Sequence, residues 1–552
     1  MTTKEFEQFL APLAHIGAAR ASQTAYFRVL TGDADPVLAV AGWVALIRRG
    51  EVRQSDHPLL LPLCTHLGLR YAAFTYFSDQ CEPELAREVA NCTPSTTTDV
   101  TQKLMLSTLD NDHKTMREAE IEAFLATGDL DHLKSAAKHA DGLGGWRSAV
   151  PDLVRLVAAN PWDPNSFTAA ASLIESASEF DLLKALVAEM RPVSALTDIL
   201  DRFDATRLFE RGEINACIKM LDAIEARQAK AKSPAPPNPL LQKLRGRVAE
   251  RQGDYKEAFR RYGAMNRLDV PKYSKSTGYI AAIQTGNALK IPSMPPAGRD
   301  DMVMMLGFPR SGTTLLENAI ASHPQIETFE EIPSVQAVRL YIERGFSRLT
   351  NELPGSKELY VAARNIFYRE IGRRQQKEGA TVFVDKMPIR TMMAPLLNKL
   401  FPGQKYIFSI RHPYDVAMSC FQQRFKPNPA MANFLNLVDT AKMYDIAMTN
   451  WFETFTLEDP NVCYVRYDEL VTDFEATTGR VITFLGLDWD SEILNFAQKA
   501  ESRATRTPSY QKVRQGLSIG VQSKWRNYDF IFKAKEAEPL TKWAKFFGYE
   551  TV

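Results

Sequence analysis

The chain has 552 residues, a length that indicates several domains. Hydrophobic residues make up 45% and charged residues 24%, which is the composition of an ordinary soluble globular protein. The 67 Lys and Arg residues balance the 66 Asp and Glu residues, so the net charge of +1 argues against bulk binding to nucleic acid or a membrane surface, although a local basic pocket is compatible with it.

The six cysteines are scattered and form no C-x-x-C pair, which disfavours both a disulfide framework and a zinc site. Reduced thiols are the simpler interpretation, and they indicate a cytoplasmic protein. The first seven residues include two acids and no apolar segment, and no apolar run reaches about 18 residues. Neither a signal peptide nor a membrane span is therefore expected.

Residues 1 to about 290 are expected to form helix after helix, because apolar residues recur at three- and four-residue spacing. The clearest unit runs from Leu241 to Pro271, with a Gly253-Asp254 turn and small residues where two helices would approach closely. This unit resembles a tetratricopeptide repeat, a helix-turn-helix element of about 34 residues. Weaker echoes elsewhere in the stretch favour an α-solenoid, with an irregular helical domain as the alternative.

Two proline-rich segments interrupt the helical pattern. The first, 233–239, is expected to be a loop between helical pairs, since prolines at this density prevent helix formation. The second, 291–298, is the better domain boundary because the character of the sequence changes after it. The predicted organisation is therefore a helical repeat domain at 1–290 and a second domain at 300–552.

After this boundary, short apolar runs alternate with helical patterns, which favours a parallel sheet with helices on both faces. The expected strands are Val303–Leu306, Thr381–Val384, Tyr406–Ile410 and Val462–Val465. Ligands of such sheets bind at the carboxyl ends of the strands. The loops that follow these strands are therefore the places where chemistry is expected.

The stretch Met302–Leu316 is an apolar run of strand length, then a loop with two glycines, then an apolar helical pattern. This order builds a phosphate-cradling loop, in which backbone N–H groups at a helix start face an anion. Gly307 and Gly312 have the spacing of a Walker A loop, but Thr313 stands where that motif needs lysine. The cation of the loop is Arg310, so the expected anion is phosphate-like but is not held as a nucleoside triphosphatase would hold it.

Charged residues also follow the later expected strands and the first helix. Glu330-Glu331 would provide a general base and a neighbour, although an acidic pair on its own is usually solvated surface. Lys386 would stabilise charge on a leaving oxygen, although a surface lysine is the simpler interpretation of that residue alone. Arg411 ends the third expected strand and, with Ser419 on the next helix, would grip a second phosphate.

His412 and Asp415 have simpler expected roles. His412 precedes a proline that restricts it, so it is expected to pack or to hydrogen-bond rather than to catalyse. Asp415 is expected to be an acidic residue at a helix start. Near the C-terminus, Ser509 and the segment 523–526 flank a polar loop rich in Gly, Ser and Gln, which suggests a segment that closes over a nucleotide.

Together these motifs resemble the sulfotransferase family. The matching residues are the Pro-Arg-Ser-Gly-Thr-Thr run at 309–314, Asp-Lys-Met-Pro at 385–388, Arg411 with Ser419, and Ser509 with Lys524-Trp525, in that order. The Arg-Ser-Gly-Thr-Thr run and the Glu-Glu pair look most like the tyrosylprotein sulfotransferase branch, and the whole chain resembles bacterial members with N-terminal tetratricopeptide repeats. The resemblance covers about residues 300 to 530 and implies a P-loop-type α/β domain that uses 3′-phosphoadenosine 5′-phosphosulfate (PAPS) as co-substrate.

The resemblance also implies a role for each matched residue. Glu331 would be the general base that deprotonates the acceptor hydroxyl, and Lys386 and Ser509, with Arg310, would stabilise the transition state. The implied PAPS-binding residues are Arg310, Ser311, Gly312, Thr313 and Thr314 at the 5′-phosphosulfate, Arg411 and Ser419 at the 3′-phosphate with Tyr467 nearby, and the loop 509–518 with Ser509 and Lys524. No metal is expected, because no carboxylate arrangement would hold Mg²⁺ against Thr313.

The chain departs from this pattern in two places. Gln423 stands four residues after Ser419, where the tyrosylprotein branch has arginine, and Arg424 follows one place later. The match weakens at 335–376, where acceptor contacts would be expected, so the sequence leaves the acceptor open.

The leading hypothesis is a sulfotransferase that moves a sulfuryl group from PAPS to an acceptor hydroxyl presented near the helical array. A peptide tyrosine is one acceptor, and a sugar or another small-molecule hydroxyl is the alternative. A P-loop kinase or nucleoside triphosphatase is disfavoured by Thr313, and an inactive repeat scaffold is disfavoured by the combined set of charged residues. No nucleic-acid partner is expected, and a homodimer is compatible with the sequence.

Overall fold

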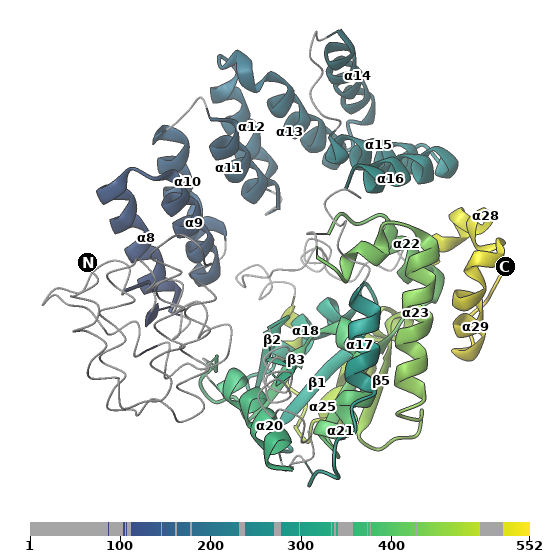
Figure 1. Cartoon of the computed structure of the whole chain (residues 1–552). Helices are drawn as coiled ribbons and strands as arrows, with labels where there is room; N and C mark the ends of the chain where they lie inside the picture. Colours follow the sequence, from purple (N-terminus) through teal and green to yellow (C-terminus); the bar gives the residue numbers. More distant parts are fainter. Residues whose placement is uncertain are drawn as a thin grey trace, which may run out of the picture. The chain divides into compact units, whose positions relative to one another are not determined.

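The computed structural model describes most of the chain from residue 112 onward (Figure 1). The described ranges are 112–144, 146–159, 163–176, 179–230, 238–269, 278–296, 299–332, 357–372, 377–425, 428–496 and 523–552, with a few single positions or pairs between 87 and 107 and at 334–335, 338–339 and 374–375. The chain groups into two compact units. One is Met1–Leu143 with Ser334–Arg348 and Asn365–Arg374, and the other is Gly144–Pro333 with Leu349–Arg364 and Gln375–Val552.

Some sequence expectations lie outside the described residues. They are most of the proline-rich loop at 233–239, Ser509 with the loop 509–518, and Cys64, Cys81 and Cys92. The other three cysteines, Cys217, Cys420 and Cys463, are buried thiols outside any disulfide.

The first unit contains helix α8 (His113–Thr127) and most of α9 (Leu130–Gly144). Asp112 caps α8, because its carboxylate accepts hydrogen bonds from the backbone N–H groups of Lys114 and Thr115 at 3.1 Å each. Gly128 ends the helix in the left-handed conformation, with φ of 73°. Gly128 therefore separates α8 from α9.

In the described part of the second unit, eight further α-helices precede the first strand. They are α10 (Trp146–Ala159), α11 (Pro164–Ser176), α12 (Phe180–Met190), α13 (Thr197–Glu210), α14 (Ile214–Lys230), α15 (Pro239–Arg251), α16 (Tyr255–Asp269) and α17 (Tyr279–Asn287). Neighbours in sequence pack against each other, for example α13 on α14 and α15 on α16. The all-helical expectation is confirmed for the described part of this stretch.

Helices α15 and α16 form a close antiparallel pair. Gly253 turns the chain between them with φ of 78°, a backbone conformation that glycine adopts without strain. Gly246 on α15 faces the ring of Tyr262 on α16, and a Cβ at position 246 would lie 2.8 Å from a ring carbon. The Tyr262 hydroxyl donates a hydrogen bond to the Glu250 carboxylate at 2.9 Å. The small residue is therefore needed for the close approach of the two helices.

Replacement of Gly246 by alanine is expected to lower the free energy of unfolding by about 1–3 kcal/mol, because the added methyl group must displace the Tyr262 ring. This loss should exceed the gain of about 1 kcal/mol that alanine brings to a helix interior. Urea denaturation measures the change, with Gly278→Ala as the control because a Cβ there meets nothing within 4 Å. A Gly246→Ala protein as stable as the wild type would contradict the packing argument.

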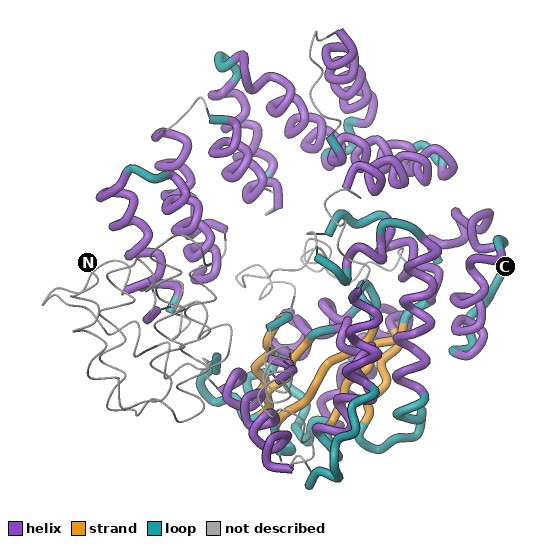
Figure 2. The backbone as a smooth tube through the Cα atoms, viewed as in Figure 1, coloured by secondary structure: helices purple, strands orange, loops and turns teal. Residues whose placement is uncertain are grey.

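In the described part of the second unit, five parallel strands form one sheet in the order β2-β3-β1-β4-β5. Figure 2 draws the strands in orange. They are β1 (Met302–Gly307), β2 (Ile326–Glu330), β3 (Val382–Lys386), β4 (Lys405–Ile410) and β5 (Val462–Arg466). The expected parallel sheet is confirmed, and all four expected strands are found within one or two residues of their predicted bounds. Because every strand pair is parallel, the five carboxyl ends lie along the same edge of the sheet.

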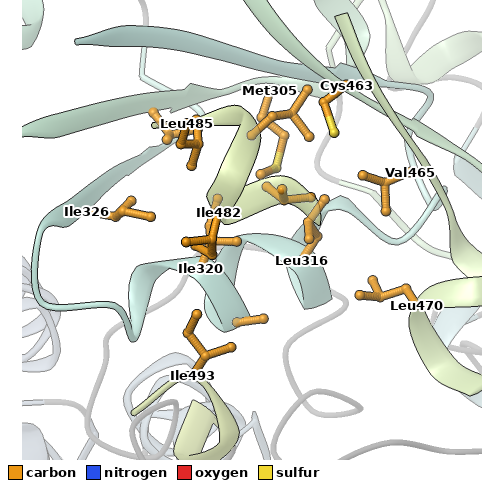
Figure 3. Close-up of a cluster of buried hydrophobic side chains, with 14 of the residues drawn as sticks. Met305, Leu316, Ile320, Ile326, Cys463, Val465, Leu470, Ile482, Leu485 and Ile493 are labelled. Atoms are coloured by element: carbon orange, nitrogen blue, oxygen red, sulfur yellow. The ribbon is translucent and has the colours of Figure 1, made fainter. Parts of the chain in front are cut away.

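Helices connect the strands and cover both faces of the sheet. The remaining elements are α18 (Thr313–Ala321), α20 (Lys357–Gly372), α21 (Ala394–Leu400), α22 (Pro413–Phe421), α23 (Leu437–Phe452), α24 (Tyr467–Thr472), α25 (Phe474–Phe484), α28 (Asp529–Phe532) and α29 (Glu538–Phe546), with short 3-10 turns η3 (Ser194–Leu196), η6 (Pro388–Met393), η7 (Met431–Phe434), η8 (Ser491–Asn495), η10 (Lys524–Tyr528) and η11 (Lys535–Ala537). On one face, Met305 and Val465 pack with Leu316 and Ile482 of α18 and α25 (Figure 3). On the other, Phe408 stacks on Trp451 of α23, with 4.1 Å between ring centroids.

The sequence pattern does not predict β2, and it ends the second expected strand too early. The segment Ile326–Glu330 contains two glutamates among five residues, so its strand character comes from pairing with β3 rather than from an apolar run. Lys386 was expected in the loop after the strand but is its last residue, opposite Glu330 of β2 and Met305 of β1. Glu330, Glu331 and Lys386 consequently lie together at the carboxyl edge.

Candidate active site

The loop between β1 and α18 has the backbone of a tight anion cradle. Three residues have positive φ: Gly307, which ends β1, at 151°, and Arg310 and Gly312 of the loop at 75° and 100°. A Cβ at position 312 would lie 2.4 Å from the Tyr467 ring, so only glycine fits beneath that side chain. The loop leads directly into the N-terminus of α18, where the helix dipole favours a negative charge.

Thr391 of η6 holds the start of this loop in place. Its hydroxyl accepts a hydrogen bond from the Gly307 N–H at 3.0 Å and also donates to the Gly307 carbonyl oxygen. The sequence gives no signal for this role, because a threonine 84 residues away becomes informative only once the fold brings it to the loop.

Arg310, Arg411 and Ser419 meet on one side of the loop. Arg310 Nε donates to Ser419 Oγ at 3.0 Å, and Arg411 Nη1 donates to the Arg310 carbonyl oxygen at 3.2 Å. The Arg411 guanidinium lies over the Tyr467 ring, 4.4 Å from its centroid. Burial lowers the pKa of Arg310 below its ordinary value, and the charge of Arg411 adds to this effect. A bound polyanion would offset the repulsion between these two cations and form charged hydrogen bonds with them.

Lys386 is fully buried among three carboxylates at the end of β3. Its Nζ lies 3.2 Å from Glu317 Oε2 and 3.3 Å from an oxygen of both Glu330 and Glu331. Burial alone would lower the pKa of Lys386, but the three carboxylates outweigh that effect and raise the pKa above its ordinary value. Lys386 is therefore a positive charge held at a fixed, buried position and is not the surface lysine that is the simpler interpretation of the sequence.

Glu331 is the most accessible member of this group, with 41% of its side chain exposed against 13% for Glu330 and 4% for Glu317. It has a positive φ of 51°, and its N–H donates to the Lys386 carbonyl oxygen at 2.8 Å. Strain of this kind at a non-glycine residue often accompanies a functional role. An accessible carboxylate beside a buried cation is suited to accept a proton from a bound hydroxyl.

Two further residues near this group were not predicted from the sequence. Arg390 donates to the Asp385 carboxylate and, at 2.5 Å, to the Ile332 carbonyl oxygen, so it fixes the chain just after Glu331. Glu317 lies on α18, four residues after Thr313, and turns its carboxylate toward Lys386. The i,i+4 spacing from the loop placed Glu317 on the same helix face as Thr313, but nothing in the sequence paired it with Lys386.

His412 and Asp415, which follow β4, lie as the sequence predicts, and Asp415 has one additional contact. His412 caps α22 by accepting from the Tyr414 N–H at 3.2 Å, and it packs between Trp525 and Tyr549, which supports a packing role. Asp415 lies in the first turn of α22, and its carboxylate also accepts from the backbone N–H groups of Ser523 and Trp525 at 3.2 and 3.0 Å. This contact fixes the backbone on both sides of Lys524.

The structure thus brings the predicted residues together in two groups at adjacent strand ends. One group joins Gly312, Arg310, Arg411, Ser419 and Tyr467, and the other joins Lys386 to Glu331. Lys524 is exposed at the start of η10, and the backbone N–H groups of its two neighbours donate to Asp415 of α22. Within the described residues, no group of three His, Cys, Asp or Glu side chains is arranged to hold a metal ion.

The segment 302–491 matches the model of the sulfotransferase family. This segment contains both groups of site residues, from the β1 loop to Tyr467. The chain therefore contains a sulfotransferase-family domain, built on a parallel sheet. Among the described residues, no helix combines the length and the apolar character that crossing a bilayer requires.

Several known proteins resemble part of this chain. Protein-tyrosine sulfotransferase 1 of Danio rerio is 24% identical over 280 residues, which are 48% of this chain and 71% of the relative. An uncharacterized protein of Aquifex aeolicus (strain VF5) is 26% identical over 240 residues. The match covers 41% of this chain and 30% of that relative. The mouse sulfotransferase SULT7A1, solved in complex with PAP, is 20% identical over 48% of this chain and 88% of that chain, with a TM-score of 0.29.

Proposed function

We propose that this chain is a PAPS-dependent sulfotransferase that moves a sulfuryl group to an acceptor hydroxyl. The observation that carries the proposal is the meeting of two charge groups at neighbouring strand ends. A cation pair with a serine lies beside the glycine loop, and a buried lysine with an accessible glutamate lies at the end of the adjacent strand. The cation pair would bind a polyanion, and the glutamate would accept the proton of a nucleophile.

In this proposal the β1 loop, Arg310 to Thr314, binds the 5′-phosphosulfate through backbone N–H groups and hydroxyls. Arg411 and Ser419 bind the 3′-phosphate, with the Tyr467 ring against the Arg411 guanidinium. Lys524 completes the nucleotide site, and Asp415 accepts from the backbone N–H groups on either side of it. Ser509, from a loop outside the described residues, keeps its proposed role at the transition state.

The reaction is a direct displacement at sulfur. Glu331 takes the proton from the acceptor hydroxyl as its oxygen forms the new S–O bond, and the bond between sulfur and the bridging oxygen of the phosphosulfate breaks. The product 3′-phosphoadenosine 5′-phosphate (PAP) leaves with the electron pair of that bond. Lys386 and Arg310 stabilise the charge that develops on the leaving oxygen and the equatorial oxygens, as in phosphoryl transfer.

A peptide tyrosine is the proposed acceptor, and the name of the Danio rerio relative supports it. A sugar or small-molecule hydroxyl is the alternative. We further propose that residues 1–290 form a tetratricopeptide-like domain that presents the acceptor to a P-loop-type domain at 300–552 of a cytoplasmic protein. The close pairing of α15 and α16 around Gly246 supports the repeat assignment. A homodimer is part of the same proposal.

The nucleotide assignment predicts that the protein binds PAP without Mg²⁺ and more tightly than ATP with Mg²⁺. The Arg411→Ala variant should weaken PAP binding about 10- to 100-fold, since a charged hydrogen bond contributes about 1.5–3 kcal/mol. Binding of adenosine 5′-phosphosulfate, which lacks the 3′-phosphate, should change far less. Isothermal titration calorimetry measures all three ligands.

The control for this experiment is Arg260→Ala, which removes an arginine from the exposed face of α16. Equal losses for PAP and adenosine 5′-phosphosulfate in Arg411→Ala would reject the 3′-phosphate assignment. Preferential binding of ATP with Mg²⁺ to the wild type would instead favour a kinase or nucleoside triphosphatase.

A further inference from the structure

A lysine from the helical region approaches the proposed 3′-phosphate site. Lys243 lies on α15, and its Nζ is 3.5 Å from Gln423 Oε1. Gln423 follows the end of α22, four residues after Ser419, and Ser419 accepts the hydrogen bond from Arg310. The contact joins residues that are 180 positions apart in the chain, so the sequence alone does not suggest it.

The charges around Lys243 are mostly positive. Burial, reinforced by Arg247, Arg310 and Arg424, lowers the pKa of Lys243 to about 8, against an opposing effect of Glu175. Arg247 pairs with Glu210 at 2.6 Å, whereas Lys243 forms no salt bridge among the residues that the structure describes. A half-buried ammonium group that faces other cations is costly unless an anion joins it.

Arg424 forms an ion pair with Asp269, so it does not take the place of the arginine that the tyrosylprotein branch has at the position of Gln423. Its guanidinium donates to both oxygens of Asp269 on α16, at 2.8 and 3.2 Å. This pair ties α16 to the segment that follows α22. The amide of Gln423 is neutral and therefore supplies no positive charge beside Ser419. Lys243 is the cation that contacts this amide.

Several contacts hold α15 and α16 in this position. Asn266 donates to the Phe421 carbonyl oxygen at 3.0 Å, and Phe259 stacks on Phe421 with 5.0 Å between ring centroids. On α15, the Glu250 carboxylate accepts from Gln422 Nε2 at 2.9 Å and from the Tyr528 hydroxyl. Lys243 is thus carried on a helix fixed to both α22 and η10.

We propose that Lys243 binds the 3′-phosphate of the nucleotide together with Arg411 and Ser419. Helix α15 then belongs to the nucleotide site as well as to the helical array, and the bound phosphate supplies the negative charge that this cluster of cations lacks. This inference rests on the proposed function, because it takes the occupant to be PAP or PAPS.

Calorimetry with PAP and adenosine 5′-monophosphate tests the inference on the full chain. Lys243→Ala and Lys243→Gln should weaken PAP binding about 10- to 100-fold, as expected for loss of one charged hydrogen bond to a phosphate. Lys243→Arg should stay within about threefold of the wild type, and the adenosine 5′-monophosphate affinity should change by less than about threefold in every variant. Lys256→Ala, an exposed lysine on α16, is the matched control.

The outcomes separate this inference from the proposed function. A wild-type protein that fails to bind PAP rejects the proposed function itself. A wild type that binds PAP, with Lys243→Gln of equal affinity, overturns the role of Lys243 alone. Equal weakening of both nucleotides also overturns it, because it would mean that Lys243 only maintains the shape of the site. The unliganded variants should unfold at the wild-type temperature or slightly above it, since they remove one charge from a group of like charges.

Discussion

Replacement of Glu331 by glutamine is expected to lower kcat about 10²- to 10⁴-fold while PAP affinity stays within about threefold of the wild type. Glutamine keeps the size of the side chain and can still meet Lys386, which lies 3.3 Å from the carboxylate. It cannot accept the proton of the acceptor hydroxyl. Steady-state transfer from PAPS to an acceptor, with calorimetry of PAP, measures both quantities.

Glu330→Gln is the matched control for this experiment. Glu330 contacts the same lysine at the same distance, but only 13% of its side chain is exposed, against 41% for Glu331. We expect its kcat to fall by less than about tenfold, because the less accessible partner of Lys386 affects the charge balance and not the proton transfer. If Glu330→Gln were inactive and Glu331→Gln fully active, Glu330 would be the base.

Replacement of Lys386 by methionine is expected to destabilise the protein by about 3–5 kcal/mol at pH 7.5, because it leaves three clustered carboxylates without their cation. It should also lower kcat about 10²- to 10³-fold through the lost charge at the transition state. In the wild type the raised pKa of Lys386 contributes stability that is fully present at neutral pH. That contribution is lost only as the pH rises through the folded-state pKa, above the ordinary lysine range.

The pH dependence of the variant should have a definite sign. Without Lys386, the clustered carboxylates take up protons more readily in the folded state than in the unfolded state, so stability should fall as the pH rises. Urea denaturation at pH 5.5 and pH 7.5 should therefore show a smaller deficit at the lower pH. Lys442→Met, at an exposed position on α23, is the control. A Lys386→Met protein as stable as the wild type at both pH values would contradict the charge argument.

The strands and the glycine loop could be predicted because their causes are local. The apolar run at Met302–Gly307 buries every side chain, and the two glycines and Arg310 take the positive φ values that the turn requires. Strand β2 escaped prediction because Ile326–Glu330 has no apolar run of its own. Its backbone becomes a strand through its partner β3, which the sequence pattern of five residues does not encode.

The sequence by itself determined which chemical groups are present and in what order, and the motifs from Pro309 to Lys524 were enough to suggest a sulfotransferase. Only the tertiary structure decided what each group faces. It placed Lys386 among three carboxylates, Arg310 against Ser419, and Lys243 beside Gln423. The hydrogen-bonded partners are 55 to 180 positions apart in the chain, so their pairing depends on the packed fold.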